Sequence, residues 1–165
     1  DLIQKYLIWI EKLTGKPRDE LCDKAQAIRP LIEKLSPLLI KEIKGLGDGA
    51  NISFGEALLC QARGEAVRVP PEGCTAFALT GSATADGNPL AGQNQDLAPE
   101  YADVAILLHV CPSDNRPRAL LFTFAGQLGY SGMNQHGLAH FANALYDCPW
   151  QMGLPHYPLK RIMLE

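Results

Sequence analysis

The stretch Gly73-Cys74-Thr75-Ala76-Phe77-Ala78-Leu79-Thr80 decides how the chain is organised, because helix-forming sequence ends before it and strand-forming sequence begins in it. Pro70-Pro71 ends the helical part a few residues earlier. A thiol at the first position of a strand, directly after a glycine, suits a chain that cleaves itself. If the Gly73–Cys74 bond breaks, the new α-amine of Cys74 lies within reach of its own sulfur. An α-amine titrates at about pH 8 and a thiol at about pH 8.5, so this amine can take the thiol proton.

The sequence after this first strand has the pattern of an antiparallel meander. Residues 89–96 form a second strand-like stretch, and residues 83–88 between the two carry an Asp-Gly hairpin signal. Residues 104–110 and 120–125 are apolar runs rich in strand formers, and residues 137–145 are a further strand candidate.

Residues 1–66 have the periodicity of helices. Apolar residues recur at three-and-four spacing from Leu2 to Leu13, and Ser53 and Glu56 have the spacing of a capping box. Helices first, then antiparallel strands, then a return to helix at residues 158–165 predict an α+β fold.

Composition excludes several classes of function. Apolar residues make up 47% and charged residues 20% of the chain, which is typical of a globular domain. The net charge is −3, and no run of Lys and Arg is interleaved with aromatic residues, so no nucleic-acid partner is predicted. The longest apolar runs, 104–110 and 119–125, are far shorter than the roughly 20 residues of a membrane span, so no membrane partner is predicted either.

The chain has five cysteines, an odd number, with no C-x-x-C pair. This argues against both a disulfide framework and a zinc site and favours an intracellular, cytoplasmic setting. Cys74 is the one cysteine at a strand start after a glycine, although it could also be a small buried hydrophobe. Glycine at position 73 would also permit the unusual backbone angles of an N-to-S acyl shift. The other four are expected to be structural: Cys22, Cys60, Cys111 and Cys148.

Asp96 is the second candidate site residue. It ends the partner strand of the predicted hairpin and would therefore lie near Cys74. A carboxylate there can orient and stabilise a protonated α-amine. The alternative is a solvated aspartate at a strand end. Gln93 and Asn94 precede it, and amides this close to an apolar strand must find hydrogen-bond partners.

Asn143 is the third candidate, because it interrupts an apolar strand. A buried amide there would destabilise the fold unless it forms hydrogen bonds. Acyl transfer needs fixed N–H donors for a developing oxyanion, and this amide could be one of them. The alternative is an edge-strand residue that points to water. Asn134 is interpreted as a turn former. His136 and His140 lie in strand-like alternation without a third ligand, so no metal is predicted.

Together these residues resemble the acyl-coenzyme A:6-aminopenicillanic acid acyltransferase family, also classed as C45 peptidases, within the N-terminal nucleophile (Ntn) hydrolases. The matching segments are Gly73-Cys74-Thr75, Gly92-Gln93-Asn94-Gln95-Asp96, and residues 132–139 running on to Asn143. Upstream, segments between residues 42 and 65 resemble the family's pro-region.

The resemblance implies a zymogen that is activated by autocatalytic cleavage between Gly73 and Cys74. Residues 1–73 would be a helical pro-region, and residues 74–165 the start of an αββα catalytic domain. Asp96 would match the family's aspartate near the N-terminal amine. Asn143 would match an oxyanion contact of the related bile-salt and penicillin V amidases.

The same resemblance assigns supporting places to Thr75, Gln93 and Asn94. The related amidases often carry Arg where this chain has Gln93, which disfavours bile-salt-like substrates. The chain lacks a later Asn and further strands that the family needs, and both ends look cut. We therefore expect a truncated piece whose active site is completed by the remainder of its own chain.

The implied activity is that of a cysteine amidohydrolase or acyltransferase. Cys74 would form an acyl-enzyme from a small amide or thioester substrate and pass the acyl group to water or to an amine. No cofactor is implied, with acyl-coenzyme A as a candidate co-substrate, and a fungal member would be peroxisomal. Two alternatives remain open: a non-catalytic binding module on the same fold, and an unprocessed precursor whose helical segment covers the site.

Overall fold

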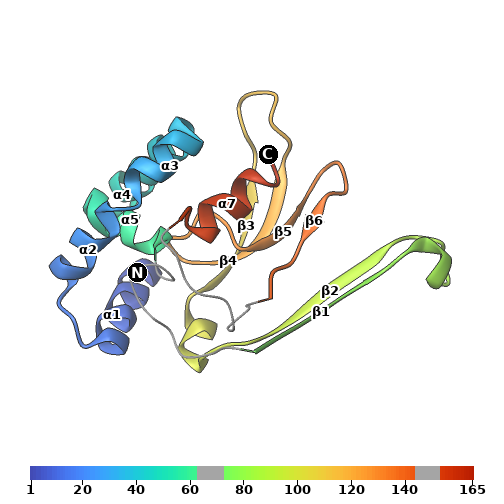
Figure 1. Ribbon diagram of the computed structural model, residues 1–165, viewed down its shortest axis with the longest axis horizontal. Coiled ribbons are helices and arrows are strands. Elements are labelled where there is room, and N and C mark those ends of the chain that lie inside the picture. The colour runs from blue at the N-terminus through green and yellow to red at the C-terminus, as the bar shows by residue number, and fades with distance from the viewer. Residues whose placement is uncertain (63–72, 144–152) are drawn as a thin grey trace.

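The computed structural model of the chain describes residues 1–62, 73–143 and 153–165. Its fold is α+β, as the sequence predicts, with a helical N-terminal part followed by antiparallel strands and a last helix (Figure 1). Pro70-Pro71 and Cys148 lie outside the described residues.

Helices precede the first strand, and local sequence signals explain where two of them begin. The described helices of this part are α1 (Leu2–Thr14), α2 (Arg18–Gln26), α3 (Arg29–Leu35), α4 (Pro37–Ala50) and α5 (Phe54–Gln61). Asp1 caps α1 by accepting a hydrogen bond from the backbone N–H of Ile3 at 3.0 Å, and Gly15 ends this helix in the left-handed region, with φ 65°. Ser53 and Glu56 form the predicted capping box at the start of α5.

The described strands form two antiparallel sheets. The first pairs β1 (Gly73–Leu79) with β2 (Leu90–Asp96), and the second has the order β3 (Ala105–Val110), β4 (Ala119–Phe124), β5 (Ser131–Asn134) and β6 (Ala139–His140). The predicted hairpin is thereby confirmed, and its tip, which contains the short 3-10 helix η1 (Gly81–Ala83), projects beyond the rest of the molecule (Figure 1). A second 3-10 helix, η2 (Pro99–Asp103), leads from β2 to β3.

The strand predicted over residues 137–145 is shorter than expected. Only Ala139–His140 joins the sheet, as β6, and residues 141–143 leave it. In this segment the carbonyl of Ala142 accepts a hydrogen bond from the Gln93 side chain on β2 at 2.8 Å instead of a ladder hydrogen bond. Residues 144 and 145 lie outside the described part of the chain.

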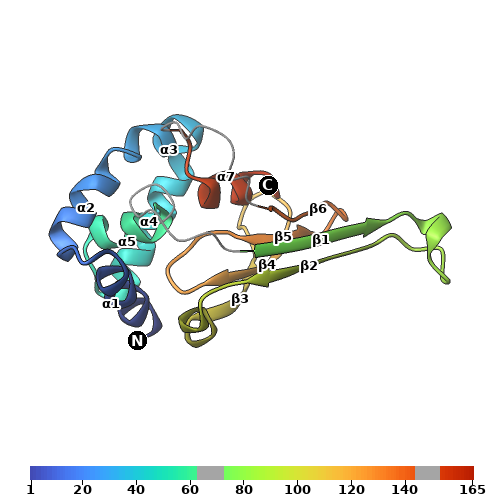
Figure 2. The ribbon, with the colours of Figure 1, turned by 60° about the horizontal axis from the view of Figure 1, so that its bottom comes forward.

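The four-stranded sheet has a different neighbour on each face (Figure 2). The last helix, α7 (His156–Ile162), lies over one face, where Leu121 packs against Leu164 just beyond the helix. On the other face, Gln95 of β2 donates a hydrogen bond to Ser131 of β5 at 3.4 Å. The described residues thus supply one helix layer and two sheet layers.

One hydrophobic core joins the N-terminal helices to the strands. Tyr6 of α1, Leu58 of α5 and Phe124 of β4 belong to the same buried cluster. Polar contacts reinforce it, because the Gln127 side chain donates to the Tyr6 hydroxyl at 2.7 Å. A break between Gly73 and Cys74 would leave the two segments packed together. None of the helices in the described part of the chain is both long and apolar enough to cross a bilayer.

Candidate active site

Cys74 is the second residue of β1 and lies directly opposite Gln95 of β2. Residues opposite each other in an antiparallel pair point to the same face of the sheet. The Gln95 side chain contacts Ser131 on the four-stranded sheet, so Cys74 also faces the space between the two sheets. Its side chain is half-buried.

Asp96 is opposite Gly73, one position away from Cys74, and so lies beside the bond that is predicted to break. The predicted proximity to the Gly73–Cys74 junction is therefore present. A Cβ atom added to Gly73 would lie 2.5 Å from Asp96 Oδ2. A side chain at position 73 would therefore displace the Asp96 carboxylate from this place.

Amide side chains join the hairpin to the segment that follows β6. Gln93 Nε2 donates to Asn143 Oδ1 at 2.9 Å and to the carbonyl of Ala142 at 2.8 Å. Gln93 Oε1 accepts hydrogen bonds from Ser131 Oγ at 3.1 Å and from Gln95 Nε2 at 3.0 Å. The structure therefore brings Gln93 and Asn143, two of the predicted site residues, into direct contact.

Asn143 differs from its predicted setting, because it is exposed and follows the strand instead of interrupting it. Thr75 and Asn94 pair with each other across the hairpin and are also exposed. By strand alternation they share the face of Gly73 and Asp96, which is opposite to that of Cys74.

Gln95 Oε1 is a buried acceptor without a hydrogen-bond partner in the described part of the chain. A buried carbonyl oxygen without a hydrogen-bond partner destabilises the folded state unless a water or a ligand donates a hydrogen bond to it. Because Gln95 is paired with Cys74, this oxygen marks a place near the thiol where an N–H group could bind.

Lys160 of α7 has a buried side chain. Its side chain is 7% exposed, and its Nζ lies 3.9 Å from the centre of the Tyr130 ring. Burial lowers the pKa of the Lys160 ammonium to about 8, while the negative charge of the Cys74 thiolate acts to raise it.

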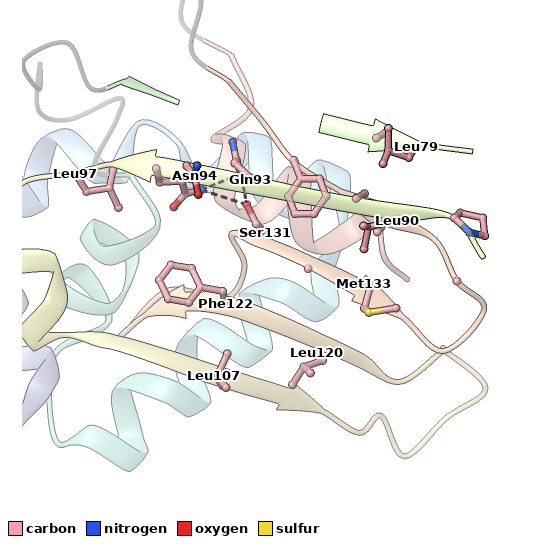
Figure 3. Close-up of a pocket in the computed structure, with 18 residues that line it drawn as sticks. Leu79, Leu90, Gln93, Asn94, Leu97, Leu107, Leu120, Phe122, Ser131 and Met133 are labelled. Carbon is pink, nitrogen blue, oxygen red and sulfur yellow. Dashed lines mark hydrogen bonds between the residues drawn. The ribbon is translucent and has the colours of Figure 1, made fainter. Parts of the chain in front are cut away.

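A cavity of about 810 Å³ lies between the hairpin and the four-stranded sheet (Figure 3). Gln93, Gln95 and Ser131 supply part of its lining, and the remainder is mostly apolar. Its apolar residues come from both sheets and include Leu79, Leu90, Leu107, Leu120, Phe122 and Met133.

The other described cysteines differ from one another. Cys60 is fully buried and Cys22 half-buried, and burial raises the pKa of their thiols to about 12 and about 11. The expectation that they are structural fits these positions. Cys111 departs from it, because it follows the end of β3 and is exposed, with its sulfur 3.5 Å from His109 Nε2.

Asn134 is a turn former, as predicted, because its Oδ1 accepts hydrogen bonds from the backbone N–H groups of His136 and Leu138. His140 is buried under α7, where its Nε2 donates to the carbonyl of Lys160 at 2.9 Å. Burial lowers the pKa of its imidazole.

Sequence reasoning missed Gln95 and Ser131. Gln95 belongs to the segment from Gly92 to Asp96, and the register of the hairpin alone would have placed it opposite Cys74. Ser131 is the first residue of β5, and no local pattern in the sequence connects it to the hairpin.

The family model for acyl-coenzyme A:6-aminopenicillanic acid acyl-transferase matches residues 83–165. The chain belongs to this family. A comparison with curated proteins found no match. As a member of the acyltransferase family, the protein is an enzyme of the acyltransferase type. The matched residues contain Asp96, Asn143 and Lys160, while Cys74 precedes them.

Proposed function

We propose that the protein is a self-processing cysteine amidohydrolase or acyltransferase of the N-terminal nucleophile type. It cleaves its own Gly73–Cys74 bond and then forms an acyl-enzyme on Cys74 from an amide or a thioester, such as an acyl-coenzyme A. The observation that carries the proposal is the hairpin register, which sets Asp96 against Gly73 and directs Cys74 toward the space between the sheets.

After cleavage, the α-amine of Cys74 takes the proton of its own thiol, and the sulfur attacks the carbonyl carbon of the substrate. The tetrahedral intermediate then expels an amine or a thiol, which takes up the proton from the α-ammonium group. Water or an acceptor amine attacks the resulting thioester and releases the acyl group. The Asp96 carboxylate, which lies opposite Gly73, would stabilise the α-ammonium form.

The oxyanion of each tetrahedral intermediate needs fixed N–H donors. Asn143 Oδ1 is occupied by the hydrogen bond from Gln93, so the Nδ2 group is the end of this amide that can donate. We expect a second donor from the remainder of the protein. The unpartnered Gln95 Oε1 can accept a hydrogen bond from the N–H of an amide substrate.

The cavity supports an apolar acyl group as the part of the substrate that is recognised. Leucine, phenylalanine and methionine side chains dominate its wall (Figure 3), and polar groups gather where Gln93, Gln95 and Ser131 bond to one another. An apolar acyl chain would fill the cavity and leave its carbonyl near these polar groups.

Intact-mass measurement of the purified protein tests the proposal. We expect two fragments, with Cys74 as the first residue of the second. They should co-purify, because Tyr6 and Phe124 belong to one core on either side of the break. One uncleaved species after prolonged incubation of the whole protein would contradict self-processing.

Thiol labelling of the native protein separates the enzyme from a non-catalytic binding module. An alkylating reagent should modify Cys74 rapidly and selectively in the enzyme, and substrate-like acyl amides should protect it. Cys22 and Cys60 serve as internal controls, since burial raises their pKa. Equal inertness of Cys74 and these two would favour the binding module.

Gly73→Ala is expected to slow self-cleavage by about 100-fold, because the new methyl group would displace the Asp96 carboxylate from the reacting junction. The cleaved fraction is followed by mass spectrometry over time. Gly45→Ala is the matched control, since a Cβ at Gly45 meets no atom within 4 Å. Equal cleavage rates of the two variants would show that the contact between Gly73 and Asp96 has no role.

A further inference from the structure

Gln93 on β2 uses its full hydrogen-bonding capacity. A glutamine amide has two N–H donors and an oxygen that can accept twice. Its Nε2 donates to the Ala142 carbonyl at 2.8 Å and to Asn143 Oδ1 at 2.9 Å. Its Oε1 accepts from Ser131 Oγ at 3.1 Å and from Gln95 Nε2 at 3.0 Å. One side chain therefore connects β2 to β5 and to the segment that follows β6.

The Ala142 carbonyl decides which way round the Gln93 amide lies. A backbone carbonyl can only accept, so the Gln93 atom that meets it must be the nitrogen. With Nε2 in this place, Oε1 faces the two donors, Ser131 and Gln95. Rotation of the amide by half a turn would set its oxygen against the Ala142 carbonyl oxygen. The reversed orientation would therefore replace a hydrogen bond by a repulsive contact.

The orientation of Gln93 in turn fixes that of Asn143. Gln93 Nε2 can only donate, so Asn143 presents Oδ1 to it and turns Nδ2 away. Asn143 is exposed, and the terminal torsion of an exposed amide is broad, so without this partner either atom could face the substrate. An oxyanion is stabilised by an N–H donor and repelled by a carbonyl oxygen. Only one of the two orientations of Asn143 is therefore useful for acyl transfer.

These amides lie on the face of the hairpin that carries the candidate nucleophile. Gln93 and Gln95 are two positions apart on β2 and so point to the same face. Cys74 is directly opposite Gln95 and shares that face. Gln93, Gln95 and Ser131 also line the cavity between the two sheets. A carbonyl group that Cys74 attacks from this face would lie beside the amides.

We propose that Gln93 is a positioning residue for the acyl-transfer reaction. Fixed by the Ala142 carbonyl, it keeps Asn143 in the orientation in which Nδ2 donates to the oxyanion of the tetrahedral intermediate. Ser131 and Gln95 hold Gln93 in place, and Gln93 itself does not touch the reacting atoms. This inference rests on the proposed function and names the residue that sets the direction of its oxyanion donor.

A double-mutant cycle between Gln93→Glu and Asn143→Ala in the whole, self-cleaved protein tests the proposal. Glutamate has nearly the shape of glutamine, but its carboxylate only accepts, so Asn143 must reverse in order to donate to it. Gln26→Glu is the matched control, because Gln26 is exposed at the end of α2. The probe is the thioester of octanoic acid with para-nitrothiophenol, and release of the coloured thiol gives kcat and KM per cleaved molecule. Intact mass gives the cleaved fraction, and circular dichroism verifies that each variant is folded.

Gln93→Glu is expected to lower kcat by about 100-fold, as the loss of an oxyanion donor does, and to leave KM within about twofold. Asn143→Ala should have the same effect, and Gln26→Glu should match the wild type. The double variant should be no slower than Asn143→Ala alone, because Gln93 acts through Asn143. A residue that only supported the fold would instead add its own loss in the double variant.

Two results would overturn the proposal and leave the proposed function intact. Wild-type turnover by Gln93→Glu would show that Asn143 needs no partner, and additive losses would show that Gln93 acts on another group. If the wild-type protein releases the thiol no faster than Cys74→Ala does, the proposed function falls as well. If Gln93→Glu does not fold or does not cleave itself, Gln93→Met takes its place in the cycle. Its expected loss is about 10-fold, since Asn143 then loses its fixed orientation.

Discussion

Cys74→Ala is expected to remain a single uncleaved chain under conditions in which the wild-type protein separates into two fragments. Alanine has no nucleophile, so neither the N-to-S acyl shift nor the later acyl-enzyme can form. Intact-mass spectrometry over several days gives the cleaved fraction directly. The expected effect is complete loss, because the same sulfur serves both steps.

Cys111→Ala is the matched control for this substitution. Cys111 is exposed and lies at the end of β3, so its removal changes the cysteine count without touching the hairpin. It should cleave as the wild type does. Cleavage of Cys74→Ala at the same bond would instead assign the break to a contaminating protease.

Cys74→Ser separates the two chemical roles of the residue. A hydroxyl is a weaker nucleophile than a thiol near neutral pH. We expect slow cleavage at the same bond and no detectable acyl transfer. A serine variant that matched the wild type in both reactions would mean that the thiol chemistry is not needed.

The hairpin that carries the site could be predicted because its signals are local. An Asp-Gly turn between two strand-forming stretches predicts an antiparallel pair, and the pairing of Gly73 with Asp96 follows from it. The capping box of Ser53 and Glu56 was predicted for the same reason. In each case the interacting groups are close together in the sequence.

The rest of the candidate site depends on contacts between segments that are distant in the sequence. In the sequence, nothing distinguishes Lys160 from an exposed lysine of a short helix, and only the structure shows that it is buried against Tyr130. The hydrogen bond from Gln93 to Asn143 could not be predicted either, since Asn143 was expected within a strand and lies after it. Tertiary packing decides both positions, and a single sequence carries no direct record of it.

Helices α4 and α7, which lie on opposite sides of the Gly73–Cys74 bond in the sequence, are also joined by the ion pair of a buried arginine, which explains how the segments could stay together after cleavage. The Arg161 guanidinium on α7 is 2% exposed and binds both carboxylate oxygens of Glu42 on α4, at 2.9 and 3.1 Å. It also donates to Glu165 at 3.0 Å and to the carbonyl of Leu128 at 3.2 Å. One side chain thus connects α7 to α4 and to the segment that contains Leu128.

Arg161→Ala is expected to lower the free energy of unfolding by about 3 to 5 kcal/mol. Removal of one partner from a buried ion pair leaves the other charge uncompensated, and the missing side chain leaves a cavity. The Glu165 side chain, at 10% exposure, would keep its contact with Arg116 but lose that with Arg161, whereas Glu42, at 36%, can recover contact with water. Urea unfolding followed by circular dichroism gives the change. The Cys74→Ala background keeps the chain in one piece, so that the transition is intramolecular.

Arg116→Ala is the control, because Arg116 binds the same Glu165 at 3.0 Å but is 28% exposed. A more exposed pair contributes about 1 kcal/mol or less. If Arg161→Ala and Arg116→Ala cost the same, the buried network does not hold α7 to α4. A double-mutant cycle with Glu42→Gln then isolates the pair itself, and a coupling energy above about 1 kcal/mol is expected for contacting residues of one network.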